Sequence, residues 1–330
     1  MTACGTGPSS SLSRKERGQH KCFWDRFLEL NLAPMGGRLA PSLTDRAGIK
    51  GGRILQYNAA VIQHDKGEDM PGRMLAEKDG AIGWMIFDHP ERRNAVTQGM
   101  WLQIGEILED FGKDEAIRVV VLKGSGDKAF VSGADISQFG QQRRNAAEVA
   151  ASNRLTDAAR EALATFPKPT IAMIQGYCLG GGLAIALMCD LRFASEGSTF
   201  GIPAARLGVG YAAQSVGMLQ SLVGPAYTRE ILFTGRRFNG DEALRMGLIS
   251  RLLPGAELAP YVQDYAAMIG VNAPLTIRAA KLASTELLKA EAERDLAVVQ
   301  RAVETCFNSA DYHEGRTAFM EKRPPSFTGR

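Results

Sequence analysis

The feature that most constrains the fold is a run of three glycines, Gly180 to Gly182, between two apolar segments. Residues 169–174, in front of it, are an apolar run bounded by proline, which predicts a buried strand. Behind it the apolar residues continue to Cys189 without a helix breaker, which predicts a buried helix. Glycine lets the backbone approach another group closely, and the first N–H groups of a helix have no partner inside it. Such a turn suits a developing negative charge, for example on an enolate oxygen, although the glycines alone fit an ordinary tight turn equally well.

A second strand-and-glycine segment occupies residues 128–136, with the sequence KAFVSGADI. It predicts a short strand, a glycine turn and the polar start of a helix. The two segments together resemble the paired oxyanion-hole motifs of the enoyl-CoA hydratase/isomerase (crotonase) superfamily. The resemblance extends from about Leu75 to Arg330. It implies an α/β chain with a crotonase-like ββα spiral core, followed by a helical C-terminal trimerisation region.

The same resemblance implies a site for an acyl-CoA thioester. The backbone N–H groups of Ala134 and Gly181 would bind the thioester carbonyl oxygen, which makes these two residues candidate catalytic groups. The residues beside them, Asp135, Ile136 and Gly180, would contact the substrate. Coenzyme A is then part of the substrate, and no separate cofactor is implied.

Two further motifs resemble the parts of this family that bind coenzyme A. Residues 89–96 (HPERRNAV) predict a turn into a helix and resemble the family's first motif, which makes Arg92 and Arg93 candidates for contacts with the nucleotide. The C-terminal tail resembles a motif in which an aromatic residue and a lysine, here Phe319 and Lys322, help to bind the adenine and phosphates, often across a subunit contact. The alternative interpretation is an amphipathic C-terminal helix with a basic end.

Composition sets the class of protein and excludes several functions. The 330 residues are 45% hydrophobic and 23% charged, as in ordinary globular proteins. The net charge of +3 is too small to favour nucleic-acid binding, and Arg143-Arg144 is too short a basic run. No apolar run reaches the roughly 20 residues of a membrane-spanning helix. The chain has no Walker A, GxGxxG or GxSxG motif.

The cysteines and histidines point to a reducing compartment and to no metal site. Five cysteines without a CxxC spacing suggest free thiols, and we therefore expect a cytoplasmic protein. The four histidines are scattered and lack the spacing of metal ligands. The expected partner is an acyl-CoA substrate, without nucleic acid or membrane. The resemblance also implies a homotrimer or a dimer of trimers.

The sequence divides into three parts. Residues 1–73 are rich in Gly, Ser, Arg and Pro, and we expect a disordered extension, with the first strand at 81–88. Residues 74–255 would form the spiral core, with a polar loop at 141–151. Residues 256–330 would form the helical C-terminal region, and the chain is expected to be helical from Tyr227 onward.

Hydratases of this family use two glutamates to handle a water and a proton. The first lies two residues beyond the glycine triplet, which is Ala184 here. The second follows the proline after the next strand, which is Ala204 here. Because a methyl group cannot transfer a proton, these residues argue against simple hydration.

The remaining unusual polar group is Tyr211, where most hydratases have proline. It resembles a tyrosine of the family's methylmalonyl-CoA decarboxylases, which differ in having histidine at the position of Ala134. Decarboxylation of a malonyl-type thioester needs no general base, and the Tyr211 hydroxyl could orient the carboxylate; Arg206 is a second candidate for that carboxylate. Two alternatives stay open: a hydratase or isomerase that uses another proton-handling group, such as Tyr211 with a water, and a protein that binds acyl-CoA without catalysis. Tyr211 could also be only a wall of the pocket.

Overall fold

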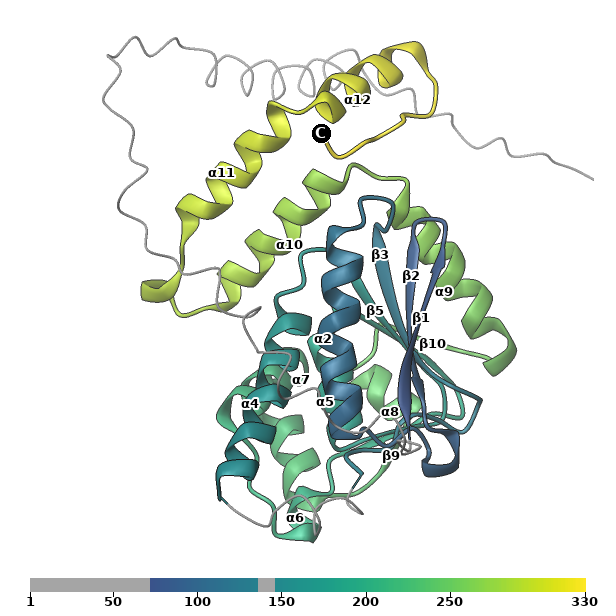
Figure 1. Cartoon of the computed structure of the whole chain (residues 1–330), viewed down its shortest axis with the longest axis vertical. Coiled ribbons are helices and arrows are strands. Elements are labelled where there is room, and N and C mark those ends of the chain that lie inside the picture. Colours follow the sequence, from purple (N-terminus) through teal and green to yellow (C-terminus); the bar gives the residue numbers. More distant parts are fainter. Residues whose placement is uncertain (1–71, 136–145) are drawn as a thin grey trace, which may run out of the picture. The chain divides into compact units, whose positions relative to one another are not determined.

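The computed structural model describes residues 72–135 and 146–330 (Figure 1). The prediction of a disordered extension over residues 1–73 therefore lies outside the described residues, except at its last two positions. Ile136 and the pair Arg143-Arg144 also lie outside them.

Two sheets form the core of the described chain. Strands β2, β3, β5 and β7 are parallel neighbours in a six-stranded sheet of order β1-β2-β3-β5-β7-β10. The strands that follow, β4, β6 and β8, pair in parallel in a four-stranded sheet of order β4-β6-β8-β9. The pairs β3-β4, β5-β6 and β7-β8 thus each place one strand in either sheet, and a helix follows each pair, which confirms the predicted ββα spiral. The strands are β1 Arg73–Asp79, β2 Ile82–Asp88, β3 Val119–Gly124, β4 Ala129–Val131, β5 Thr170–Ile174, β6 Tyr177–Leu179, β7 Leu191–Ser195, β8 Thr199–Gly201, β9 Phe238–Asn239 and β10 Arg251–Leu253.

The helices cover both faces of the six-stranded sheet (Figure 1). Met85 and Leu122 point to the face that packs on α2 and α5, whereas Val121 and Phe193 point to the face that packs on α9. Because these strands are buried on both sides, their sequences are continuous apolar runs rather than alternating ones. The helices are η1 Pro90–Arg92, α2 Gln98–Lys113, α4 Ala146–Ala164, α5 Gly181–Met188, α6 Ala204–Leu207, α7 Ala213–Thr234, α8 Gly240–Arg245, α9 Gly255–Gly270, α10 Pro274–Leu288, η3 Glu291–Glu293, α11 Leu296–Phe307 and α12 Ala310–Glu321. None of these helices is long and apolar enough to cross a membrane.

Three sequence predictions of secondary structure were wrong. The first strand is β1, which pairs antiparallel with β2; it is a polar edge strand in which only Met74 is buried, so it lacks an apolar run. Helix α4 begins at Ala146, inside the predicted loop, because its first turns are rich in alanine, the best helix former. The chain after Tyr227 is not all helical, since it contains β9 and β10. Strands of two or three residues depend on their partners in the sheet and leave little pattern in the sequence.

Candidate functional site

The three glycines that follow β6, of which Gly181 and Gly182 begin α5, differ in whether the fold requires glycine. Gly180 adopts φ 52° and ψ −113°, a conformation that other residues avoid. A Cβ atom on Gly182 would lie 2.1 Å from the carbonyl oxygen of Val131 in β4, so the packing of α5 requires glycine there. Gly181 has neither constraint, because its φ is not positive and the atom nearest to an added Cβ would be the Ala134 nitrogen at 3.5 Å. The fold therefore does not require glycine at position 181, and its missing side chain leaves space in front of the helix.

The N–H group of Ala134 lies beside that space. Val96 forms a parallel bridge in which its N–H donates to the Gly133 carbonyl (2.9 Å) and its carbonyl accepts from Asp135 (3.0 Å). The residues on either side of Ala134 thus bind Val96, which turns the Ala134 N–H away from that segment. Gly181 is the first residue of α5, so no carbonyl inside the helix can accept from its N–H. Among the residues that the structure describes, no loop or turn oxygen accepts from either group.

The two donors therefore meet at the positive end of a helix, where they can stabilise an oxygen that gains negative charge. We call the N–H groups of Ala134 and Gly181 the oxyanion site. The structure brings the two predicted catalytic donors together, with Gly180 and Asp135 directly beside them.

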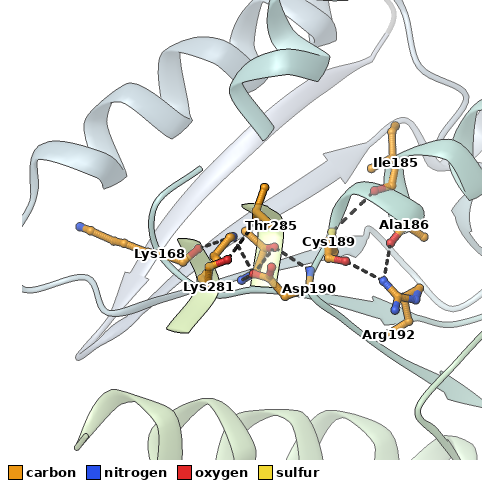
Figure 2. Close-up of polar contacts among 9 residues, drawn as sticks. Lys168, Ile185, Ala186, Cys189, Asp190, Arg192, Lys281 and Thr285 are labelled. Atoms are coloured by element: carbon orange, nitrogen blue, oxygen red, sulfur yellow. Dashed lines mark hydrogen bonds and ion pairs between the residues drawn. The ribbon is translucent and has the colours of Figure 1, made fainter. Parts of the chain in front are cut away.

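The far end of α5 is fixed by charged side chains (Figure 2). Arg192, which is 5% exposed, donates from Nη1 to the carbonyls of Cys189 (2.6 Å) and Ala186 (3.4 Å). A cation at this position also complements the negative end of the helix dipole. Asp190 accepts from Thr170 N (2.8 Å) and from Lys281 Nζ (2.7 Å) of α10. These contacts hold α5 against the sheet and so fix the position of Gly181.

The positions of the two alanines follow from the surroundings of the same helix. Residues of α5 are buried except Gly181 and Ala184, which are half-buried and lie one turn apart on one face. Ala204 is the first residue of α6 and follows Pro203, whose Cδ lies 4.0 Å from the point where a Cβ on Gly180 would be. Ala184 therefore lies one turn from Gly181, and Ala204 follows the proline that approaches Gly180; neither methyl group can donate or accept a proton.

Tyr211 lies between α6 and α7 and is partly buried. Like Ala204, it packs against the hydrophobic cluster on the face of the six-stranded sheet that α2 and α5 cover, which we call the main core cluster. Burial raises the pKa of Tyr211 above its usual value, and the charge of Arg160 opposes that shift. The hydroxyl is therefore protonated at neutral pH and can donate a hydrogen bond. Arg206, by contrast, is exposed and donates from Nε to the Thr234 carbonyl (3.4 Å), at the C-terminal end of α7.

The turn before α2 places arginines beside the oxyanion site. The carbonyls of Arg92 and Arg93 accept from Ser132 Oγ (3.2 Å) and Ser132 N (3.1 Å), two residues before Ala134. The guanidinium of Arg93 lies over the Tyr177 ring at 5.1 Å, and Arg237 lies at 5.4 Å from the same ring. Arg237 was not among the predicted site residues, because nothing in the sequence connects it with residues more than a hundred positions away.

Buried amide contacts hold that turn in place. Arg93 and Asn94 both adopt positive φ, 53° and 55°, which is uncommon for residues other than glycine. The Asn94 amide donates to the carbonyls of Ala129 (2.7 Å) and Ser125 (3.0 Å), and its oxygen accepts from His89 N (3.0 Å). Asn94 thus joins the arginine turn to β4, the strand that leads to Ala134.

The C-terminal candidates lie elsewhere in the chain. Phe319 is 84% exposed on α12, and Lys322 ends that helix with φ 57°. The tail that follows is bound to the amino end of β3, where Arg118 donates to the Phe327 carbonyl (3.4 Å) and Arg330 pairs with Glu115 (2.7 Å). A cavity of about 330 Å³ lies at this same edge of the sheet. The oxyanion site follows the opposite ends of the strands, so one chain does not bring Phe319 and Lys322 to it.

The cysteines near the site are not nucleophiles. Burial raises the pKa of the Cys178 thiol far above its usual value and that of Cys189 to about 12, so both stay protonated. Within residues 72–135 and 146–330 there is also no group of three or more potential metal ligands.

Comparison with known proteins gives a consistent result. The family model for enoyl-CoA hydratase/isomerase matches residues 77–330. A crotonyl-CoA hydratase from Syntrophomonas wolfei is 32% identical over 257 residues, which are 78% of this chain and 98% of the relative. A short-chain-enoyl-CoA hydratase from Clostridium acetobutylicum is 31% identical over 250 residues, which are 76% of this chain and 95% of the relative.

Solved structures agree with these relatives. The structure of an enoyl-CoA hydratase/carnithine racemase from Magnetospirillum magneticum has a TM-score of 0.71 at 33% identity and covers 78% of this chain and 96% of that one. The structure of an enoyl-CoA hydratase from Bacillus anthracis has a TM-score of 0.71 at 28% identity, and the match covers 78% of this chain and 99% of that one. The protein has the crotonase fold, and the chain belongs to the enoyl-CoA hydratase/isomerase family of acyl-CoA enzymes.

Proposed function

We propose that this protein decarboxylates a malonyl-type acyl-CoA through a thioester enolate held at the oxyanion site. The observation that carries the proposal is that alanine stands one turn after Gly181, at Ala184, and directly after Pro203, at Ala204, while the N–H groups of Ala134 and Gly181 lie together. The site has donors for an enolate oxygen but no carboxylate at either alanine. Hydration needs proton-transfer groups, which typically contribute roughly 10²–10⁴-fold each.

The reaction needs only groups that the site has. The bond between Cα and the substrate carboxylate breaks, carbon dioxide leaves, and the electron pair enters the thioester to form an enolate. The enolate oxygen accepts hydrogen bonds from Ala134 and Gly181, which stabilise the transition state leading to it. The Tyr211 hydroxyl orients the carboxylate before the bond breaks. A proton from water then completes Cα.

Arginines that have no carboxylate partner among the described residues support binding of the nucleotide. Arg93 and Arg237 lie over the Tyr177 ring, next to the segment that carries Ala134. Within the described chain neither forms an ion pair, so both guanidinium groups are available for the phosphates of coenzyme A. Asp135 and Ile136 would contact the pantetheine arm, and Arg92 would lie near the nucleotide.

The C-terminal helices support self-association, which we propose as a homotrimer or a dimer of trimers. Phe319 and Lys322 would then contact the coenzyme A bound by a neighbouring copy. Large apolar side chains are exposed on these helices, as expected for a contact between subunits: Leu287, Leu288, Leu296, Phe307, Phe319 and Met320. The buried free thiols of Cys178 and Cys189 support a reducing location, which we propose to be the cytoplasm.

Turnover of matched substrates tests the reaction. Malonyl-CoA and methylmalonyl-CoA should lose carbon dioxide, whereas crotonyl-CoA should be hydrated very slowly. The names of the hydratase relatives favour a second candidate, a hydratase in which Tyr211 and a water handle the proton. Efficient hydration of crotonyl-CoA would establish that candidate and overturn decarboxylation. Affinity for coenzyme A thioesters without any turnover would indicate a binding protein.

A further inference from the structure

Arg160 on α4 is a cation with an incomplete set of partners. Its Nε is buried, and none of the described residues accepts a hydrogen bond from it. The guanidinium carbon lies 5.3 Å from the centre of the Trp101 ring, which holds the plane of the group. Among the described residues, the carboxylate within 4 Å is that of Asp157, which is 3.9 Å away and 73% exposed, so it is at most a weak partner. A buried, unsatisfied donor on a charged group is costly unless a ligand completes it.

The position of Arg160 connects it with the site. Its own helix contributes Ala159 and Leu163 to the main core cluster, on which Tyr211 and Ala204 also pack. The charge of Arg160 acts on the Tyr211 hydroxyl, which also senses Cys178, two residues before Gly180. The side chain is 41% exposed although its Nε is buried, so its outer nitrogens are open to a ligand. Arg160 thus lies within electrostatic range of the Tyr211 hydroxyl, on a helix that packs against the same core cluster.

We propose that Arg160 recognises a carboxylate on the acyl group of the substrate and thereby sets the specificity of this site for acidic acyl-CoA thioesters. The inference rests on the proposed binding of acyl-CoA. The planar guanidinium matches the two oxygens of a carboxylate, and among the described residues its exposed outer nitrogens have only the weak contact with Asp157. Arg206, the arginine that the sequence suggested for this role, instead binds the end of α7.

The chemistry of decarboxylation predicts which kinetic constant depends on Arg160. The negative charge of the carboxylate leaves as neutral carbon dioxide, so a cation that holds it stabilises the bound substrate more than the transition state. Arg160 would therefore lower KM and do little to raise kcat. A residue that only supports the packing of α2 against α4 would instead change the unfolding temperature and would affect every acyl-CoA alike.

Binding of malonyl-CoA and acetyl-CoA, which differ by the carboxylate alone, tests the proposal. The intact chain is compared with Arg160→Gln, Arg160→Lys and a control, Arg154→Gln, which removes the same charge from an exposed position of the same helix. Affinities are measured by rapid mixing, before turnover, together with unfolding temperatures and initial rates. Arg160→Gln should weaken malonyl-CoA about 10- to 100-fold, the loss expected for a charge-assisted hydrogen bond, and leave acetyl-CoA unchanged. Arg160→Lys should lose less, and Arg154→Gln should match the intact chain.

Each outcome decides between the two proposals. Equal weakening of both thioesters, or an unchanged affinity for malonyl-CoA in Arg160→Gln, overturns the role of Arg160, even if the intact protein decarboxylates malonyl-CoA. Selective weakening of malonyl-CoA in a protein that releases no carbon dioxide supports the carboxylate site and overturns decarboxylation. If the intact chain has no affinity for acetyl-CoA, both proposals are wrong.

Discussion

Substituting alanine for Gly181 and for Gly182 separates the chemistry of the glycine turn from its structural role. The two residues are adjacent in the chain, and each substitution adds one methyl group. On Gly181 the methyl carbon would lie 3.5 Å from the Ala134 nitrogen, an ordinary contact, and the backbone conformation accepts alanine. On Gly182 it would lie 2.1 Å from the Val131 oxygen and 2.8 Å from the Val131 Cβ, inside a buried contact of backbone with backbone.

These distances predict opposite effects. Gly181→Ala should change the free energy of unfolding by at most about 1 kcal/mol, because alanine suits a helix better than glycine. Its methyl group would border both donors and obstruct the thioester, so turnover should fall by about 10²-fold or more, as when one oxyanion donor is lost. Gly182→Ala should cost about 1–3 kcal/mol or more, because neither β4 nor α5 can move away without repacking.

Thermal unfolding followed by circular dichroism measures the first effect, and initial rates with malonyl-CoA measure the second. We expect a native unfolding temperature and little activity for Gly181→Ala, and a lowered unfolding temperature for Gly182→Ala. Full activity of a folded Gly181→Ala protein would show that the oxyanion site does not act as described. A native unfolding temperature for Gly182→Ala would show that the close contact with Val131 is wrong.

Three further variants test the remaining parts of the site. Ala184→Glu combined with Ala204→Glu should raise crotonyl-CoA hydration measurably in a spectrophotometric assay, though far below a true hydratase, because no surrounding groups orient the new carboxylates; no gain at all would contradict their placement beside the oxyanion site. Tyr211→Phe should lower kcat for malonyl-CoA while the affinity for acetyl-CoA, measured by calorimetry, stays the same. Arg237→Gln should weaken every coenzyme A thioester about equally, and the loss should shrink as salt is raised, since salt screens contacts with phosphates; an effect limited to one acyl group would exclude a contact with the nucleotide.

Much of the site depends on local features that the sequence contains. The apolar run over residues 169–174, the breaker-free run after the glycines and the second glycine turn at Gly133 predicted two strands and a helix, and the structure confirms them as β5, β4 and α5. A hairpin signal was also present at Asp79-Gly80, where Gly80 has φ 56°, and it would have located β1. Such signals are readable because the physics of a turn involves only a few adjacent residues.

Other features required the tertiary structure. Three consecutive glycines are identical as letters, and only their neighbours in space distinguish Gly181, which faces open space, from Gly182, which faces Val131. Likewise Arg160 and Tyr211 are far apart in the chain, yet α4 and the α6–α7 connection pack on the same core cluster. The sequence alone therefore determined the family, the spiral of strands and helices and the candidate donors of the oxyanion site. The fold decided which side chains surround those donors, because contacts between distant segments depend on packing and leave no local pattern.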